Sequence, residues 1–197
     1  MDSNDDKNVQ VTIATDAERP LFRNLMQAYE HDLSEFTGDV PGPDGIFSVG
    51  EYFDVFWTEP ERFPFKILHR HQIAGFALVR SFEPGAYSMS EFFVLRSFRR
   101  TGVGRAAAIL LFRQFAGEWH VAQDDANEPA QRFWRQTIGD YTNGDFIEAY
   151  SESRPRGAMR SSIPKGKEPA PIMLPFPLER RRDHLAAREQ TLPTSHQ

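Results

Sequence analysis

Residues 92–105 read FFVLRSFRRTGVGR and predict a turn from a buried strand, with an apolar run at 92–95, into a helix. Gly102 and Gly104 allow the backbone to turn tightly and to approach a ligand closely. The first turn of the helix presents free N–H groups and the positive end of the helix dipole. Four arginines add positive charge around it: Arg96, Arg99, Arg100 and Arg105. The stretch therefore predicts a site for an anion, most naturally a phosphate or pyrophosphate.

Other phosphate-binding loops fit the sequence poorly. The chain has no GxxxxGK[ST] motif of the kind that holds nucleoside triphosphates. The dinucleotide fingerprint GxGxxG also fails, because Ala107 stands near the place of the third glycine and no acidic ribose partner follows at the right distance. The simpler alternative is an ordinary turn with arginines for solubility. Four arginines within ten residues favour the anion site over that alternative.

On both sides of this stretch, strand patterns and helix patterns alternate. An alternating strand at 9–14 precedes a helix from about Asp16, with Thr15 and Glu18 as its capping pair. A loop with two prolines and four glycines spans 37–50. The remaining segments are expected as a helix at 51–57, strands at 65–69, 73–79 and 87–95, a helix at 102–115, a strand at 119–121, a helix at 127–137, and strands at 141–152 and 171–176. This order predicts a mixed α/β sheet with helices packed on it.

Two motifs, in this order, resemble the GNAT superfamily of N-acetyltransferases. Residues 99–104, RRTGVG, resemble the pyrophosphate loop R/Q-x-x-G-x-G/A of that family. Residues 127–134, NEPAQRFW, resemble its N-x-x-A-x-x-F-Y helix and follow about 25 residues later. The resemblance covers residues 91–135 in motif detail and residues 8–152 in the order of elements.

The resemblance implies an α/β (α+β) fold with a central mixed sheet. The sheet would have about six to seven strands, splayed between the fourth and the fifth, with about four flanking helices. One acyltransferase domain would span residues 1–178. Residues 179–197 would form a polar, partly disordered C-terminal tail.

The resemblance also implies acetyl-CoA as co-substrate, with no metal. Acetyl-CoA would lie between the splayed strands, with its pantetheine arm along the strand edge at Val94 and near Asn127. Its pyrophosphate would lie on the turn before the helix. The implied cofactor-binding residues are Val94, Arg96, Arg99, Arg100, Thr101, Gly102, Val103, Gly104, Arg105, Asn127 and Trp134.

For the transfer, the resemblance implies direct attack of a primary amine on the thioester in a ternary complex. The chain has no cysteine, which fits a reaction without a thiol nucleophile. Glu91 is the candidate base, because it is the only carboxylate in the strand at 87–95 and its neighbours are apolar. The alternative is a solvent-facing glutamate. The backbone N–H of Val94 is the candidate donor to the developing oxyanion.

The acid that protonates the leaving thiolate stays open. Many members of the resembling family carry Tyr at the position of Trp134, and an indole does not act as an acid. Tyr150 is a weak candidate for this role, and Tyr141 is another, both from the strand expected at 141–152. A thiol with a pKa of about 8.5 also leaves tolerably as the thiolate.

Charge and composition argue against several other classes of protein. Residues 1–150 carry 14 Lys and Arg against 23 Asp and Glu, and residues 151–197 carry 9 against 5. The acidic body argues against nucleic-acid binding. No apolar run approaches the ~20 residues of a membrane span. The first ten residues are polar and do not resemble a signal peptide, so we expect a cytoplasmic protein that does not bind membranes.

The acceptor is expected to be a small-molecule or peptide amine. An acidic run leads into the loop at 37–50: Glu30, Asp32, Glu35 and Asp39. It is either a solvated helix end or a surface that attracts a cationic amine. A function of another class, a non-catalytic acyl-CoA-binding sensor or interaction module, is modestly favoured by Trp134. The sequence leaves the oligomeric state open, a homodimer included.

Overall fold

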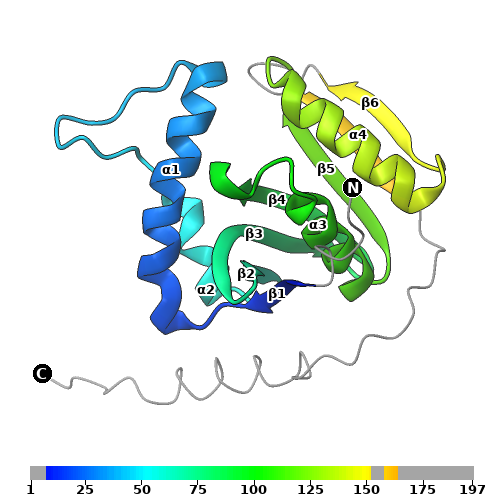
Figure 1. Cartoon of the computed structure of the whole chain (residues 1–197), viewed down its shortest axis with the longest axis horizontal. Helices are drawn as coiled ribbons and strands as arrows, with labels where there is room; N and C mark the ends of the chain where they lie inside the picture. Colours follow the sequence, from blue (N-terminus) through cyan, green and yellow to red (C-terminus); the bar gives the residue numbers. More distant parts are fainter. Residues whose placement is uncertain (1–7, 152–157, 164–197) are drawn as a thin grey trace, which may run out of the picture.

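Seven strands form one mixed sheet in the computed structural model, which describes residues 8–151 and 158–163 (Figure 1). Their order across the sheet is β1-β2-β3-β4-β5-β7-β6. The strands are β1 (Val9–Ile13), β2 (Arg62–His69), β3 (Gln72–Glu83), β4 (Ala86–Val94), β5 (Glu118–Asp124), β6 (Ile147–Ser151) and β7 (Ala158–Ile163). Neighbouring strands are antiparallel except β4 and β5, which are parallel. The mixed sheet predicted from the sequence is confirmed.

Four α-helices connect the strands within the described residues: α1 (Arg19–Thr37), α2 (Val55–Thr58), α3 (Val103–Gln114) and α4 (Glu128–Thr142). The predicted capping pair precedes α1, where the N–H and the hydroxyl of Thr15 donate to the Glu18 carboxylate at 2.9 and 3.1 Å. The first turn after Thr15 is 3₁₀ helix, so α1 itself begins three residues later than expected. Gly38 ends α1 in the left-handed conformation (φ +72°), and the predicted loop follows.

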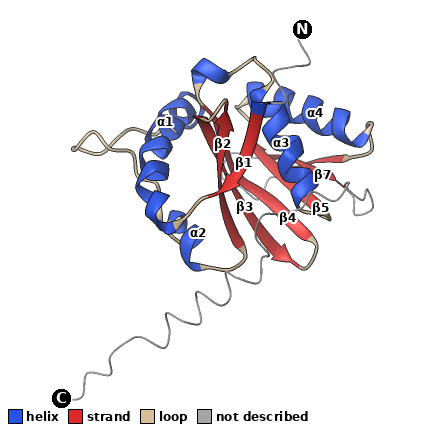
Figure 2. Cartoon of the chain, turned by 60° about the horizontal axis from the view of Figure 1, so that its bottom comes forward, coloured by secondary structure: helices blue, strands red, loops and turns tan. Residues whose placement is uncertain are grey.

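The helices cover the two faces of the sheet in pairs, α1 and α2 on one face and α3 and α4 on the other (Figure 2). The alternation of side chains along β3 explains how one strand serves both layers. Phe76 and Leu78 pack with α1 and α2, whereas Ala77 and Val79 pack with α3 and α4. In the second layer, fully buried Trp119 of β5 meets Phe112 of α3 edge-on at 5.0 Å between ring centroids.

Strands β4 and β5 pair only along their first halves. Residues 86–89 pair with residues 118–121, although β4 continues to Val94 and β5 to Asp124. Beyond the last pair, Met89 with Val121, the two strands separate (Figure 1). This confirms the splay expected between the fourth and fifth strands. We call the space between their unpaired second halves the split.

A β-bulge in β4 marks the start of the split. Leu78 of β3 pairs with Glu91 and Val79 pairs with Met89, so Ser90 is an extra residue on β4. A bulge bends its own strand and increases the local twist. Ser90 follows the last residue that pairs with β5, so the bulge turns β4 away from β5 where their pairing ends.

The C-terminal part of the fold corrects the sequence predictions. The helix expected at 127–137 continues to Thr142 and includes Gly139, and it ends at Asn143 in the left-handed conformation (φ +55°). The strand expected at 141–152 is therefore shorter, and Tyr141 belongs to α4 and not to a strand. Strand β7 was not expected, because AMRSSI has little apolar alternation.

The segment after the loop at 37–50 is less regular than the sequence predicts. The helix expected at 51–57 is a 3₁₀ turn, η3 (Glu51–Phe53), followed by the short α2. The strand expected at 171–176 and the domain boundary at 178 lie outside the described residues. Within residues 8–151 and 158–163, none of the helices combines the length and the apolarity that crossing a bilayer requires.

Gly75 of β3 is expected to be indispensable for the sheet. A Cβ built there would lie 1.9 Å from the carbonyl oxygen of Phe93, a backbone atom of the adjacent strand that cannot move aside cheaply. Gly75→Ala should lower the free energy of unfolding by about 1–3 kcal/mol or more. Gly139→Ala is the matched control: its Cβ would lie 3.6 Å from Phe146, an ordinary contact, and alanine favours the helix by up to about 1 kcal/mol. Urea unfolding measures both, and equal stability of the two variants would contradict the close approach.

Candidate functional site

The turn from β4 into α3 has the geometry of an anion-binding loop. A 3₁₀ turn, η4 (Arg96–Phe98), follows β4, and the backbone then takes positive φ at Arg100 (+61°) and Gly102 (+90°). The first hydrogen bond of α3 runs from the N–H of Ala106 to the carbonyl of Gly102 at 2.9 Å. The N–H groups of residues 103–105 precede that ladder and lie at the positive end of the helix dipole.

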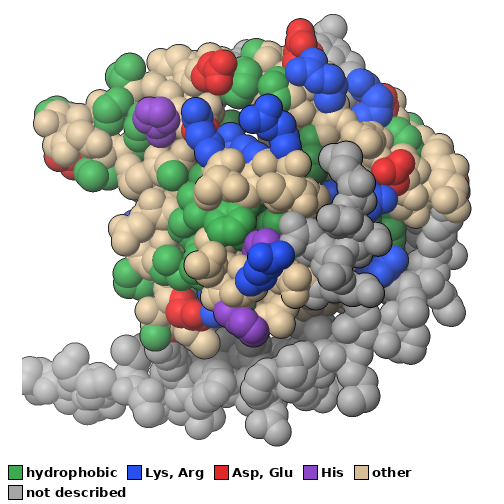
Figure 3. Space-filling view, viewed as in Figure 1, with side chains coloured by type: hydrophobic (Ala, Val, Ile, Leu, Met, Phe, Trp, Pro, Cys, Tyr) green, Lys and Arg blue, Asp and Glu red, His purple; other side chains and the backbone are tan. Residues whose placement is uncertain are grey.

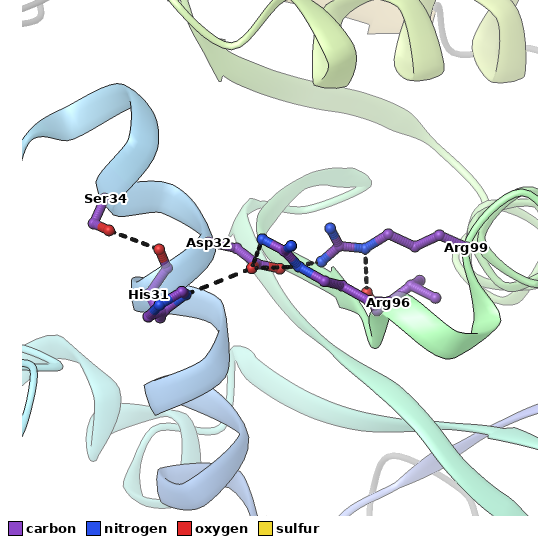
Figure 4. Close-up of polar contacts among 6 residues, drawn as sticks. His31, Asp32, Ser34, Arg96 and Arg99 are labelled. Atoms are coloured by element: carbon purple, nitrogen blue, oxygen red, sulfur yellow. Dashed lines mark hydrogen bonds and ion pairs between the residues drawn. The ribbon is translucent and has the colours of Figure 1, made fainter.

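Two of the four arginines at this loop are bound to one carboxylate. Arg96 donates from Nε and Nη2 to Oδ1 of Asp32 at 2.9 and 2.6 Å, and Arg99 donates to the other oxygen (Figure 4). Partial burial raises the pKa of the Asp32 carboxyl, but the bonds from Arg96 and Arg99 outweigh it and hold the pKa below its ordinary value. Asp32 is thus neither a solvated residue nor a free anion. That Arg96 and Arg99 also contact a pyrophosphate stays a prediction from the sequence.

Arg99 also fixes the end of β4. Its Nε donates to the carbonyl of Val94 at 2.7 Å. The N–H of Leu95 donates to Ala74 of the β3 side at 2.8 Å, so by alternation the N–H of Val94 points away from β3, toward the split. The Val94 N–H therefore faces the space in which the family resemblance implies the thioester. The carbonyl of the same residue accepts the hydrogen bond from Arg99.

Of the other loop residues, some contact the rest of the protein and one is exposed to solvent. Arg105 pairs with Asp140 of α4 at 3.2 Å, and the Thr101 hydroxyl donates to the Phe98 carbonyl at 2.7 Å. The Val103 side chain is buried in the core, so only its backbone can meet a ligand. Arg100 is exposed, and no ion pair to it occurs among the described residues. Lys and Arg side chains gather on the face seen in Figure 3, in the region between α1 and α4.

Helix α4 begins after its cap residue Asn127 and brings Trp134 to the split. Asn127 caps the helix by accepting a hydrogen bond from the N–H of Ala130 at 3.0 Å, which leaves its amide nitrogen without an acceptor among the described residues. Trp134 is 5% exposed and meets Phe92, on the unpaired half of β4, edge-on at 5.0 Å. It therefore forms an apolar wall where β4 leaves β5.

Glu91 projects from β4 to the opposite face, toward α1. It accepts a hydrogen bond from the hydroxyl of Tyr29 and a second from the hydroxyl of Tyr52 at 3.0 Å. Glu91 is thus a bound carboxylate and not a solvent-facing one. The sequence pattern identifies neither tyrosine as a partner of Glu91: Tyr29 has the spacing of a core residue in α1, and Tyr52 lies 39 residues from Glu91.

Three groups near Glu91 have raised pKa values. Burial, followed by the negative charge of Glu91, raises the pKa of Tyr29 and of Tyr52 above the ordinary tyrosine value. Half-buried Glu30 has its pKa raised from 4.5 to about 7, first by desolvation and then by the charges of Glu91 and Asp39. Glu30 and Glu91 thus interact as like charges, and a cation placed beside them would relieve that repulsion.

The structure places the two candidate acids, Tyr141 and Tyr150, in different elements. Tyr141 stands in the last turn of α4 and packs on Phe112 of α3 at 5.3 Å between centroids, so it does not reach the site from a strand as expected. Tyr150 lies in β6, where its backbone pairs with Met159, and its side chain lies outside the described part of the chain.

Comparison with known proteins places these features in a family. Residues 25–139 match the family model described as Acetyltransferase (GNAT) family. A search of curated proteins finds no match.

Solved structures share the fold at low identity. An acetyltransferase from Thermus thermophilus has a TM-score of 0.62 at 14% identity, over 80% of this chain and 97% of that one. The spermidine N-acetyltransferase of Vibrio cholerae, in complex with CoA and spermine, has a TM-score of 0.57 at 10% identity, over 80% and 95%. The ribosomal-protein-S18-alanine N-acetyltransferase of Escherichia coli has a TM-score of 0.55 at 14% identity, over 85% and 99%.

Glu30 is expected to titrate with a pKa of about 7, and with a lower pKa when Glu91 loses its charge. Because the native pKa lies above 4.5, the unfolded chain gives up this proton first, and the contribution of Glu30 to stability falls as the pH rises from about 4.5 to 7. Glu91→Gln should shift the Glu30 titration, followed by carboxyl ¹³C NMR, toward 4.5.

The matched control for this titration is Glu59→Gln, which removes a carboxylate that pairs with Arg62 instead. It should leave the pKa of Glu30 unchanged. A Glu30 titration that is the same in wild type and in Glu91→Gln would show that the two carboxylates do not interact.

Proposed function

The chain belongs to the acetyltransferase (GNAT) family, and we propose that it transfers the acetyl group of acetyl-CoA to a primary amine by direct attack in a ternary complex. The observation that carries this proposal is the split between β4 and β5, which ends at the start of α3. At the split, the unpaired edges of β4 and β5 lie near the free N–H groups at the start of α3.

The residues present fit coenzyme A. Strand edges that lack partners suit an arm with amide groups, and the helix start suits a pyrophosphate. A Cβ at Gly104 would lie 3.4 Å from Phe133 and 3.5 Å from Val94, so the space beside this glycine is bordered by the end of β4 and by α4. We propose that the backbone of residues 100–105 holds the pyrophosphate and that Asn127 and Trp134 border the arm. When bound, acetyl-CoA supplies the activated acetyl group as a thioester.

Glu91 is proposed as the base that takes a proton from the acceptor ammonium. The hydrogen bonds from Tyr29 and Tyr52 hold its carboxylate at one place on β4. Both tyrosines have raised pKa values, so they stay protonated and continue to donate at neutral pH. The deprotonated amine attacks without an acyl-enzyme, which agrees with a chain that has no cysteine.

The Val94 N–H is proposed as the donor to the oxygen that gains charge during the attack. Arg99 supports this role, because it holds the carbonyl of the same residue and so limits rotation of the strand end. Trp134 gives no exchangeable acid, so the thiolate is proposed to leave unassisted. The alternative acid is Tyr150 of β6.

The acceptor is proposed to be a small-molecule or peptide amine. Glu30 and Glu91 support a cationic acceptor, since both lie on the side of the sheet that faces α1. The structural neighbours include enzymes named for spermidine and for the alanine of a ribosomal protein. The second candidate, a non-catalytic acyl-CoA-binding module, draws support from Trp134. A cytoplasmic location and a homodimer remain proposals.

An amine panel separates the two candidates. Polyamines, amino acids, aminoglycosides and peptide N-termini are each mixed with acetyl-CoA and the protein, and free thiol is measured. The enzyme requires thiol release that depends on the amine. Binding of acetyl-CoA with no amine-dependent release for any acceptor class would favour the binding module.

Glu91→Gln is expected to lower turnover by about 100-fold or more while the affinity for acetyl-CoA is retained, because the amide cannot take the proton. Glu59→Gln serves as the control and should keep full turnover. Thiol release gives the rate and calorimetry the affinity. Near-normal turnover of Glu91→Gln at pH 7 would assign the base to another group or to water.

Gly104→Asp is expected to abolish binding of acetyl-CoA without unfolding the protein. Its side chain would place a negative charge at the proposed pyrophosphate site, whereas Gly104→Ala adds only a methyl group in tight but tolerable contact with Phe133. The two variants share the same backbone position, so the difference in affinity between them reports the charge. Equal affinities by calorimetry would remove the pyrophosphate from this loop.

A further inference from the structure

Strand β5 carries one polar residue in its buried row. Side chains along β5 alternate between the two faces, and Trp119, Val121 and Gln123 share the face that α3 and α4 cover. Trp119 and Val121 belong to the apolar core, as their composition predicts. Gln123 follows them at 6% exposure, so an amide occupies a place where the pattern calls for an apolar residue.

The amide nitrogen of Gln123 is buried without a hydrogen-bond partner in the described structure. Buried polar groups are almost always paired, since leaving one unpaired costs about 1–3 kcal/mol. The carbonyls of Asp124 and Asp125, which follow it in the chain, accept from Nε2 of Gln131 at 3.3 and 2.9 Å and not from Gln123. An unpaired amide at this place therefore calls for a partner that the described residues do not provide.

Gln123 stands at the split. It lies two residues beyond Val121, the last residue of β5 that pairs with β4. On the other strand, Phe92 is on the same face, since it packs against Phe133 and Trp134 of α4. Gln123 and Phe92 thus border the split from its two sides, on the layer closed by α4.

We propose that the side-chain amide of Gln123 binds the pantetheine arm of coenzyme A through one of that arm's amide groups; this rests on the proposed function. An amide offers both a donor and an acceptor, as does each amide of pantetheine, so the two groups are complementary. The arm then supplies the partner that the amide lacks among the described residues. Gln123 is a binding residue that orients the arm and takes no part in proton transfer.

The test compares two substitutions that each remove a buried, unpaired polar atom. Gln123→Met keeps the length and burial of the side chain and removes the amide. Thr12→Val is the matched control, because the Thr12 hydroxyl is the other buried unpaired side-chain group among the described residues and lies in β1, at the far edge of the sheet. Thermal unfolding and calorimetry with CoA and with ADP, which has the pyrophosphate but no pantetheine arm, are measured for each variant.

Gln123→Met should unfold at the same temperature as the wild type or higher, and should bind CoA about three- to tenfold more weakly. Its affinity for ADP should not change. Thr12→Val should likewise keep or raise the unfolding temperature, with unchanged affinity for CoA.

Equal affinity of the wild type and Gln123→Met for CoA would overturn the assignment of Gln123 alone. The same would follow from an equal loss for CoA and ADP, or from a marked loss of stability, which would reveal a partner for the amide in the free protein. A wild-type protein that binds no CoA would overturn the proposed function and this assignment with it.

Discussion

The end of pairing between β4 and β5 is the constraint on which the rest of the site depends. Backbone N–H and C=O groups inside a sheet are costly to leave unpaired, so two strands separate only when each is held from its other side. β3 holds β4 along its length, and β7 holds β5 from Trp119 to Asp124. The sheet therefore stays intact around a gap in its middle, and the Ser90 bulge sets where that gap begins.

Helix α1 meets the end of β4 through two residues one turn apart. Tyr29 reaches Glu91 on the strand, and Asp32 reaches Arg96 and Arg99 on the loop that follows it. Residues three apart share one face of a helix, so a single face of α1 holds both contacts. With Arg99 also bonded to Val94, the helix, the strand end and the loop form one connected unit of polar contacts.

The sequence predicted the parts of this protein that local patterns determine. The glycines and arginines of 96–105 and the Asn127 helix identified the family, the alternation of elements predicted the mixed sheet, and the resemblance to the family implied its splay. The structure adds what depends on distant partners. Nothing local to Asp32 shows that it binds Arg96, 64 residues away, nor does the spacing around Tyr29 distinguish a core residue from a partner of Glu91. Strand β7 was missed for a similar reason, since it is held by pairing with β5 and β6 and not by its own apolar pattern.

Successive side chains of β4 point to opposite faces of the sheet. Glu91 faces α1 and its tyrosines, and Phe92 faces α4 and its aromatic wall, so one strand acts as a partition between the two sides. Changes in α1 or in the loop that follows it alter one compartment while the other keeps its shape. Under the proposed function, such an arrangement lets acceptor preference diverge between related chains without rebuilding the half of the fold assigned to the co-substrate.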